Sequence, residues 1–367
     1  MKICSTVVSL VFGLVFFTGS AHAQNFWVER GDIGPDDTIH LAWVHGTAHT
    51  LWLWTLSNDG SNVLSDVVYA PPAQSNICWF SDIYVRSNNT IAATWDTTNS
   101  FVVYNLTSSN TWIRRDDYPK PDGWWPGAVL LGYDDKLRVL WTRSADNALA
   151  IWTLDTNGNI VASAGVFVPP TGWSVADEGW NADIGPDGNV RVVWSNTGGD
   201  VSIWSINSTG AVVSSVFWAA PSGWSCTNED ISVGSDNKMR IFWEHPSDGA
   251  VSLWVVGTDG TNVETSAFWL PPSGWHFEGG GVLGSSNNVG MAWVSSTQAS
   301  LWKLNSALTP VSSLLVDLTE PWEVRSAELD SANKLHLLWA NSSGVCSLWR
   351  MDTGWTNVEA VATYGPY

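Results

Sequence analysis

A strand-like segment that ends in tryptophan occurs seven times in this chain, about every fifty residues. A second aromatic segment follows each of them about ten residues later. The first series ends at Trp43, Trp95, Trp141, Trp194, Trp243, Trp293 and Trp339, and the second contains Trp54, Tyr104, Trp152, Trp204, Trp254, Trp302 and Trp349. Two aromatic positions that keep the same order over seven repeats indicate one structural unit used seven times.

Each repeat has room for four strands. A third segment ends near an aromatic residue and runs into a proline corner, and a further short segment precedes the next tryptophan-ended strand. Four of the corners have the form Pro-x-Gly-Trp, and they end at Trp124, Trp173, Trp224 and Trp275. Turn sequences such as GPDGN and DTNGN separate the segments, as tight hairpins require. No stretch shows helical periodicity.

These repeats predict an all-β fold, a seven-bladed β-propeller of four-stranded antiparallel blades. A single small sheet would leave two apolar faces and an open edge, whereas radial stacking buries both faces against neighbouring sheets. Tryptophan at the same position of nearly every blade then fills the space between blades. We expect the tryptophans of the first and second of these aromatic segments to be structural.

The amino terminus predicts export. Lys2 precedes a short apolar run, and Ala21-His22-Ala23 precedes Gln24, which is the order of a secretory signal peptide. The sequence therefore predicts a signal peptide over residues 1–23, cleavage near Ala23, and a single propeller domain over residues 24–367. We expect a secreted or periplasmic protein without membrane insertion, because the apolar run is too short to be an anchor.

The charge of the chain limits its partners. The formal net charge is −19 at pH 7, although only 14% of residues are charged. Such a charge repels phosphate backbones and anionic lipid headgroups, so we expect no nucleic-acid or membrane binding. The cysteines lack metal-ligand spacing and no loop has the dense acidic pattern of calcium sites, so we predict no metal and no cofactor.

The corner tryptophans are the first candidate ligand-binding residues. Because successive strands alternate direction, the corners share one rim with the loops that follow the tryptophan-ended strands. Those loops contribute Asn196, Glu244 and His245. Indole faces beside polar groups suit sugars, whose rings have an apolar C–H face and hydroxyls at the edge. The alternative is that Trp124, Trp173, Trp224 and Trp275 only wedge between blades.

A cationic residue precedes the strand-ending tryptophan by three positions in most repeats, and three of these residues are Arg138, Arg191 and Arg240. One interpretation is that they pair with carboxylates, since buried arginines are rarely left without partners. The expected partners are the aspartates of the recurring Asp-Ile pairs, which are Asp32, Asp82, Asp183 and Asp230. The other interpretation is that the arginines bind a ligand directly.

Nothing in the sequence identifies an enzyme. Glycoside hydrolysis needs two carboxylates on opposite sides of one bond, and the candidate aspartates here are repeated rather than unique. The chain also has no nucleophile elbow, no metalloprotease helix motif and no phosphate-binding loop.

The segments LRVLW, VRVVW and MRIFW resemble the arginine-bearing strand of tryptophan-rich propeller lectins, especially the fucose-binding type. This resemblance implies that Arg138, Arg191 and Arg240 contact sugar hydroxyls and that the four corner tryptophans stack on the ring. The LLW, LW and YGPY rhythm of the whole chain is also similar to repeats in secreted bacterial proteins.

These observations together predict a non-catalytic, lectin-like protein that binds a glycan or polysaccharide at several sites on one rim. A scaffold for another secreted protein is the alternative, and an enzyme acting on polysaccharide ranks third.

Overall fold

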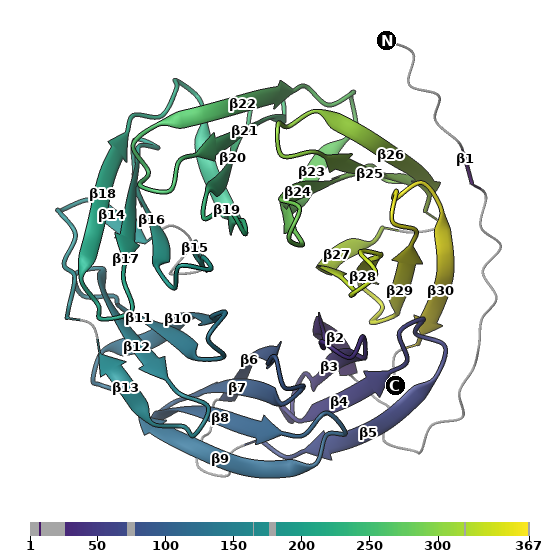
Figure 1. Ribbon diagram of the computed structural model, residues 1–367, viewed down its shortest axis with the longest axis horizontal. Coiled ribbons are helices and arrows are strands. Elements are labelled where there is room, and N and C mark those ends of the chain that lie inside the picture. The colour runs from purple at the N-terminus through teal and green to yellow at the C-terminus, as the bar shows by residue number, and fades with distance from the viewer. Residues whose placement is uncertain are drawn as a thin grey trace. The chain divides into compact units, whose positions relative to one another are not determined.

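The computed structural model describes residues 7–8, 26–71, 78–163, 165–175, 181–318 and 321–365, without the side chains of residues 7, 8, 78 and 227–230. In these ranges the chain forms seven four-stranded antiparallel blades and no helix, which confirms the predicted fold class of a seven-bladed β-propeller (Figure 1). Consequently, none of these ranges contains a helix able to cross a membrane. The predicted signal peptide lies outside the described residues except for β1 (Val7–Val8).

The blades cluster into two compact units. Unit 1 comprises residues 1–119, 294–302 and 312–367, and unit 2 comprises residues 120–293 and 303–311. Within each blade the strands are hydrogen-bonded in chain order, and we letter them a to d.

Unit 1 contains blades 1, 2 and 7. Blade 1 has β2 (Phe26–Ile33), β3 (Ile39–His45), β4 (Leu51–Leu56) and β5 (Val63–Tyr69). Blade 2 has β6 (Cys78–Val85), β7 (Ile91–Thr97), β8 (Ser100–Leu106) and β9 (Trp112–Pro119). Blade 7 has β27 (Glu323–Leu329), β28 (Leu335–Ala340), β29 (Cys346–Met351) and β30 (Val358–Tyr364).

Unit 2 contains blades 3, 4 and 5, and blade 6 has strands in both units. Blade 3 has β10 (Trp124–Leu131), β11 (Leu137–Arg143), β12 (Ala148–Leu154) and β13 (Ile160–Ser163). Blade 4 has β14 (Trp173–Val175) and β15 (Ala182–Ile184) in the a position, then β16 (Val190–Asn196), β17 (Val201–Ile206) and β18 (Val212–Trp218). Blade 5 has β19 (Ser225–Val233), β20 (Met239–His245), β21 (Ala250–Val256) and β22 (Val263–Trp269). Blade 6 has β23 (His276–Leu283), β24 (Asn288–Val294), β25 (Gln298–Leu304) and β26 (Pro310–Asp317).

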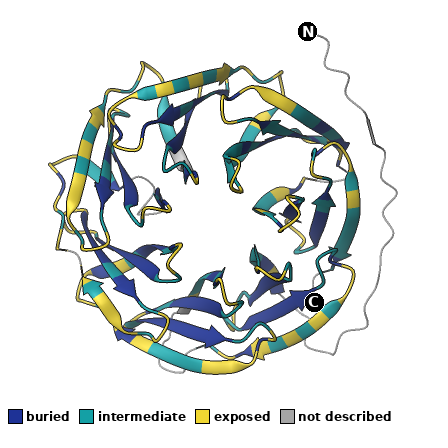
Figure 2. Cartoon of the chain, in the orientation of Figure 1, coloured by how far each residue is buried: buried dark blue, intermediate teal, exposed yellow. Residues whose placement is uncertain are grey.

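The repeated tryptophans form the core of each blade, as the sequence predicted. All seven strand-b tryptophans are at most 3% exposed. In six blades the strand-b ring contacts the aromatic ring of strand c, with centroids 4.7–5.9 Å apart. Figure 2 shows strands b and c buried along most of their length, while the d strands alternate between exposed and covered residues. This pattern is the one expected for d as the edge strand of the blade.

Aromatic residues at the ends of d strands join neighbouring blades. In unit 1 the Tyr364 hydroxyl donates to the Gly60 carbonyl, and the Tyr69 hydroxyl donates to the Asn110 carbonyl. In unit 2 the Trp218 indole donates to the Gly260 carbonyl at 3.1 Å. Each acceptor lies in the turn between strands c and d of the next blade, so the third aromatic of the repeat serves to join blades.

Candidate functional site

The Pro-x-Gly-Trp corners are tight turns with a defined geometry. In each, the tryptophan backbone N–H donates to the carbonyl of the proline three residues earlier, at 3.0–3.1 Å. The glycine before the tryptophan has a φ of 79° to 86°, in the left-handed region. This is the pattern of a type II turn with glycine at its third position, where other residues are strained. The turn explains why the corner has the same four-residue form in blades 3 to 6.

The corners of blades 3, 4 and 5 lie beside the loop between strands b and c of their own blade. Trp124 is the cross-strand partner of Arg143, and Trp173 is the partner of Asn196. Trp224 contacts the ring of His245, with centroids 5.3 Å apart. Within each of these blades, the predicted association of corner tryptophan and b–c loop is therefore present. We call this part of a blade its corner edge.

The corner tryptophans differ in how accessible they are. Trp124 is 9% exposed, and the Arg143 guanidinium covers its ring at 4.8 Å from the centroid. Trp275 is partly buried in blade 6. Trp173 and Trp224 are also partly buried, and each contacts a phenylalanine of strand d at about 6 Å. Trp124 therefore offers little free ring to a ligand, and the binding role of all four residues stays a prediction.

The polar loop residues are mostly engaged within their own loops. The Asn196 side-chain oxygen accepts from the backbone of Gly198 and Asp200, at 2.8 and 3.1 Å. Nδ1 of His245 lies 2.8 Å from an Asp248 carboxylate oxygen. Glu244 is half-buried, and burial raises the pKa of its carboxyl. Asn196 and His245 thus stabilise the conformation of their own loops. A binding role for Asn196, Glu244 and His245 stays a prediction.

The three strand-b arginines are paired with carboxylates, but not with the predicted ones. Their side chains are only 1–2% exposed. Each guanidinium binds the aspartate four residues earlier, in the turn between strands a and b, at 2.5–2.6 Å. The pairs are Arg138–Asp134, Arg191–Asp187 and Arg240–Asp236. The predicted pairing with Asp32, Asp82 and Asp183 is therefore wrong, and Asp230 lies outside the described side chains. Ligand binding by the three arginines stays a prediction.

The strand-a aspartates instead accept backbone hydrogen bonds. One oxygen of Asp32 accepts from Ile33 in its own strand and the other from Val85 in the next blade, both at 2.7 Å. Asp183 makes the same pair of bonds, with Ile184 and Val233. Burial raises the pKa of Asp32 to about 7 and that of Asp183 to about 6.

The Asp-Ile pairs do not share one register position. Asp32 and Asp183 lie opposite the strand-b histidine or arginine, but Asp82 lies opposite Thr94, two residues away from the equivalent position. The side chain of Asp230 is outside the described set. Among the residues whose side chains are described, no group of three or more acidic, histidine or cysteine residues could hold a metal ion.

Three exposed tryptophans that the sequence analysis did not select lie at the corner edges of blades 1, 2 and 3. Trp27, Trp79 and Trp125 are 41%, 61% and 47% exposed. Each is the second residue of strand a in its blade. Its cross-strand partner is the residue that directly follows the strand-b tryptophan. Each precedes the strand-b tryptophan of its blade by sixteen residues (43 − 27, 95 − 79 and 141 − 125). That constant spacing is the signal that could have found them.

The first two of these indoles are connected by one loop of unit 1, residues 45–50. The Trp27 ring covers Gly46, where an added Cβ would lie 2.5 Å from the ring. At the other end of the loop, the His49 ring contacts Trp79 edge-on, with centroids 5.3 Å apart. Trp27 also donates from its indole nitrogen to Glu29 at 2.9 Å. The two indoles are therefore linked through one loop, and we call the two indoles and this loop the blade 1–2 platform.

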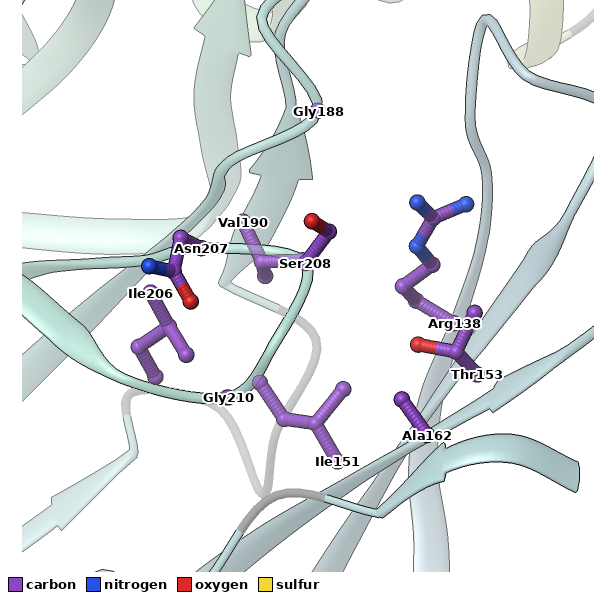
Figure 3. Close-up of a pocket in the computed structure, with 10 residues that line it drawn as sticks. All are labelled: Arg138, Ile151, Thr153, Ala162, Gly188, Val190, Ile206, Asn207, Ser208 and Gly210. Atoms are coloured by element: carbon purple, nitrogen blue, oxygen red, sulfur yellow. The ribbon is translucent and has the colours of Figure 1, made fainter.

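A cavity in unit 2 lies between neighbouring blades rather than at a corner edge. Figure 3 shows Arg138 and Thr153 of blade 3 facing Ser208 and Asn207, from the c–d turn of blade 4. Ile151, Val190 and Ile206 contribute apolar walls. The cavity is thus a packing gap beside the buried arginine, and we do not assign a ligand to it.

Comparison with known proteins identifies the fold but no family. No protein-family model and no curated protein sequence matches the chain. Among solved structures, it is similar to prolyl oligopeptidase B from Galerina marginata (10% identity, TM-score 0.63, covering 94% of this chain and 52% of that chain). A prolyl endopeptidase gives 12% identity and a TM-score of 0.61, with 94% of this chain and 49% of that chain covered. The Dos1 propeller gives 12% identity and a TM-score of 0.54, and the match covers 89% of this chain and 82% of that chain. The chain spans about half the length of the two peptidases, and identities this low support the β-propeller fold alone.

Proposed function

We propose that this protein is a non-catalytic carbohydrate-binding protein that holds glycans at the corner edges of its blades. The observation that carries the proposal is the set of exposed indoles Trp27, Trp79 and Trp125 at one register position. A sugar ring stacked on each indole would remove its apolar surface from water. With a signal peptide over residues 1–23, binding would take place outside the cytoplasm.

Repetition supports binding at more than one site. The three indoles belong to successive repeats of the chain, and partly buried corner tryptophans lie at the corner edges of blades 4 to 6. A single stacked sugar binds weakly, whereas a polysaccharide that engages several sites at once gains avidity without any new contact. The proposed ligand is therefore a polymer or an oligosaccharide.

The test is binding to a panel of immobilised polysaccharides, with single tryptophan variants. We expect Trp79→Ala and Trp27→Ala to weaken binding about fivefold each, since a stacked aromatic contributes about 1 kcal/mol. Trp112→Ala is the matched control, because Trp112 is 47% exposed but begins strand d, away from the corner edge. Absence of binding to every glycan, or an equal loss in Trp112→Ala, would contradict the proposal.

A protein-binding role is the second candidate, and a feature of unit 2 favours it. Phe217 and Phe268 are 57% and 59% exposed, and they contact Trp173 and Trp224 in consecutive blades. Exposed aromatic residues beside partly buried ones are typical of protein interfaces. If this role is correct, the double variant Phe217→Ala/Phe268→Ala loses a cross-linked protein partner while polysaccharide binding is unchanged.

A further inference from the structure

The blade 1–2 platform combines two indoles with carboxylates on the same faces of their strands. Glu29 lies two residues after Trp27 on strand a, and its carboxylate accepts from the indole nitrogen at 2.9 Å. Asp96 is the direct cross-strand partner of Trp79, so the two side chains lie on one face of blade 2. Glu29 and Asp96 are partly exposed. Each indole of the platform therefore has a carboxylate beside it.

The two b–c loops at the platform contain no lysine or arginine, and the guanidinium of Arg30, the residue after Glu29, lies 3.9 Å from an Asp82 carboxylate oxygen. Residues 45–50 read His-Gly-Thr-Ala-His-Thr, and residues 97–100 read Thr-Thr-Asn-Ser. Blade 3 differs at the equivalent places, because Trp125 lies opposite Thr142 and the next residue of strand b is Arg143. The surroundings of Trp27 and Trp79 are thus acidic, whereas those of Trp125 are not.

We propose that the blade 1–2 platform selects saccharides that carry a protonated amine, such as polymers of glucosamine. This inference rests on the proposed carbohydrate-binding function and specifies its ligand. An ammonium group is attracted to the face of an indole and to a carboxylate, and a sugar ring presents both its C–H face and the amine within one residue. The net charge of −19 draws cationic polymers towards the chain and repels acidic ones.

The experiment compares glucosamine oligomers with N-acetylglucosamine oligomers of the same length, which carry an uncharged acetamide in place of the amine. We expect the wild type to bind the glucosamine oligomer at least tenfold more tightly at low salt, and the difference to shrink at high salt because screening weakens partly exposed charge pairs. Glu29→Gln and Asp96→Asn should each reduce this preference while the affinity for the acetylated oligomer stays unchanged. Trp112→Ala, which changes an exposed indole away from the corner edge, is the control and should leave the preference intact.

The outcomes separate the two proposals. Equal affinity for the two oligomers would overturn the amine selectivity and leave carbohydrate binding standing. Failure to bind either oligomer, together with failure to bind any other glycan, would overturn both. Thermal unfolding of each variant checks that it is folded. If Asp96→Asn fails to fold, Glu29→Gln still tests the role of charge, because Glu29 is partly exposed and lies on strand a, an edge strand of blade 1.

Discussion

The carboxylate of Asp32 joins two blades of unit 1, because one of its oxygens accepts a hydrogen bond from the backbone amide of Val85 at 2.7 Å. Its other oxygen accepts from Ile33 within the same strand. Asp32→Ala would leave two enclosed amides without an acceptor, so we expect the free energy of unfolding to fall by about 2 kcal/mol. Denaturant unfolding measures the loss. Asp32→Asn retains one oxygen acceptor and should lose less, and equal losses would contradict this account.

The buried strand-a aspartates predict that the free energy of unfolding decreases as pH rises from mildly acidic to neutral. Burial raises the pKa of Asp32 to about 7 and those of Asp82 and Asp183 to about 6, whereas unfolded carboxylates titrate near 4. Between these values the folded chain binds more protons than the unfolded chain, so the free energy of unfolding falls as pH rises from about 4 to about 7.

The opposite trend applies at lower pH. Hydrogen bonds from Ser57 and Ser61 lower the pKa of Asp59 to about 2, so its contribution is lost as pH falls below about 4. Calorimetric melting temperatures measured from pH 3 to pH 9 should therefore pass through a maximum near pH 4 to 5. A melting temperature that rises from pH 5 to pH 8 would rule out protonation of these aspartates in the folded state.

Removing the carboxylate partner of a buried arginine should strongly reduce the free energy of unfolding, and replacing the arginine as well should recover most of the loss. Asp187→Ala leaves the Arg191 guanidinium, whose side chain is 1% exposed, without its carboxylate, and we expect a loss of about 2 kcal/mol in unfolding free energy. The double variant Asp187→Ala/Arg191→Leu removes the charge as well and should recover most of that loss. If Arg191 serves only this ion pair, glycan binding by the folded double variant should equal that of the wild type, whereas a loss of binding would support the predicted contact between Arg191 and the ligand.

The sequence was sufficient for the fold because the features that determine it are repeated. The strand-b tryptophans recur about every fifty residues in all seven blades, and the corner glycines do so in blades 3 to 6, with the same physical task in each blade. The salt-bridge partners were also present in the sequence, since Asp134, Asp187 and Asp236 each precede their arginine by four residues. They were missed because the Asp-Ile pairs offered a more conspicuous pattern.

The exposed indoles were harder to recognise for a physical reason. Irregularities in strand a, such as the register shift between Val28 and Arg30, change which face each residue occupies relative to strand b. Trp27 and Trp79 also follow corners that lack the Pro-x-Gly-Trp form, so the corner motif did not lead to them. Which of two adjacent aromatic residues is exposed depends on the pairing of strands, and that required the structure.

The corner turns allow backbone strain to be separated from crowding. Gly123 and Gly223 have φ values of 79° and 86°, so alanine is strained at either site and should cost about 1 kcal/mol. At Gly123 an added Cβ meets nothing within 4 Å, whereas at Gly223 it would lie 2.7 Å from the His245 ring, which contacts Trp224. We therefore expect Gly223→Ala to lose more stability than Gly123→Ala and to change tryptophan fluorescence, because the His245 ring must move. Equal effects in denaturant unfolding and fluorescence would show that His245 does not hold Trp224 in place, and Trp224 would then be free to reorient towards a ligand.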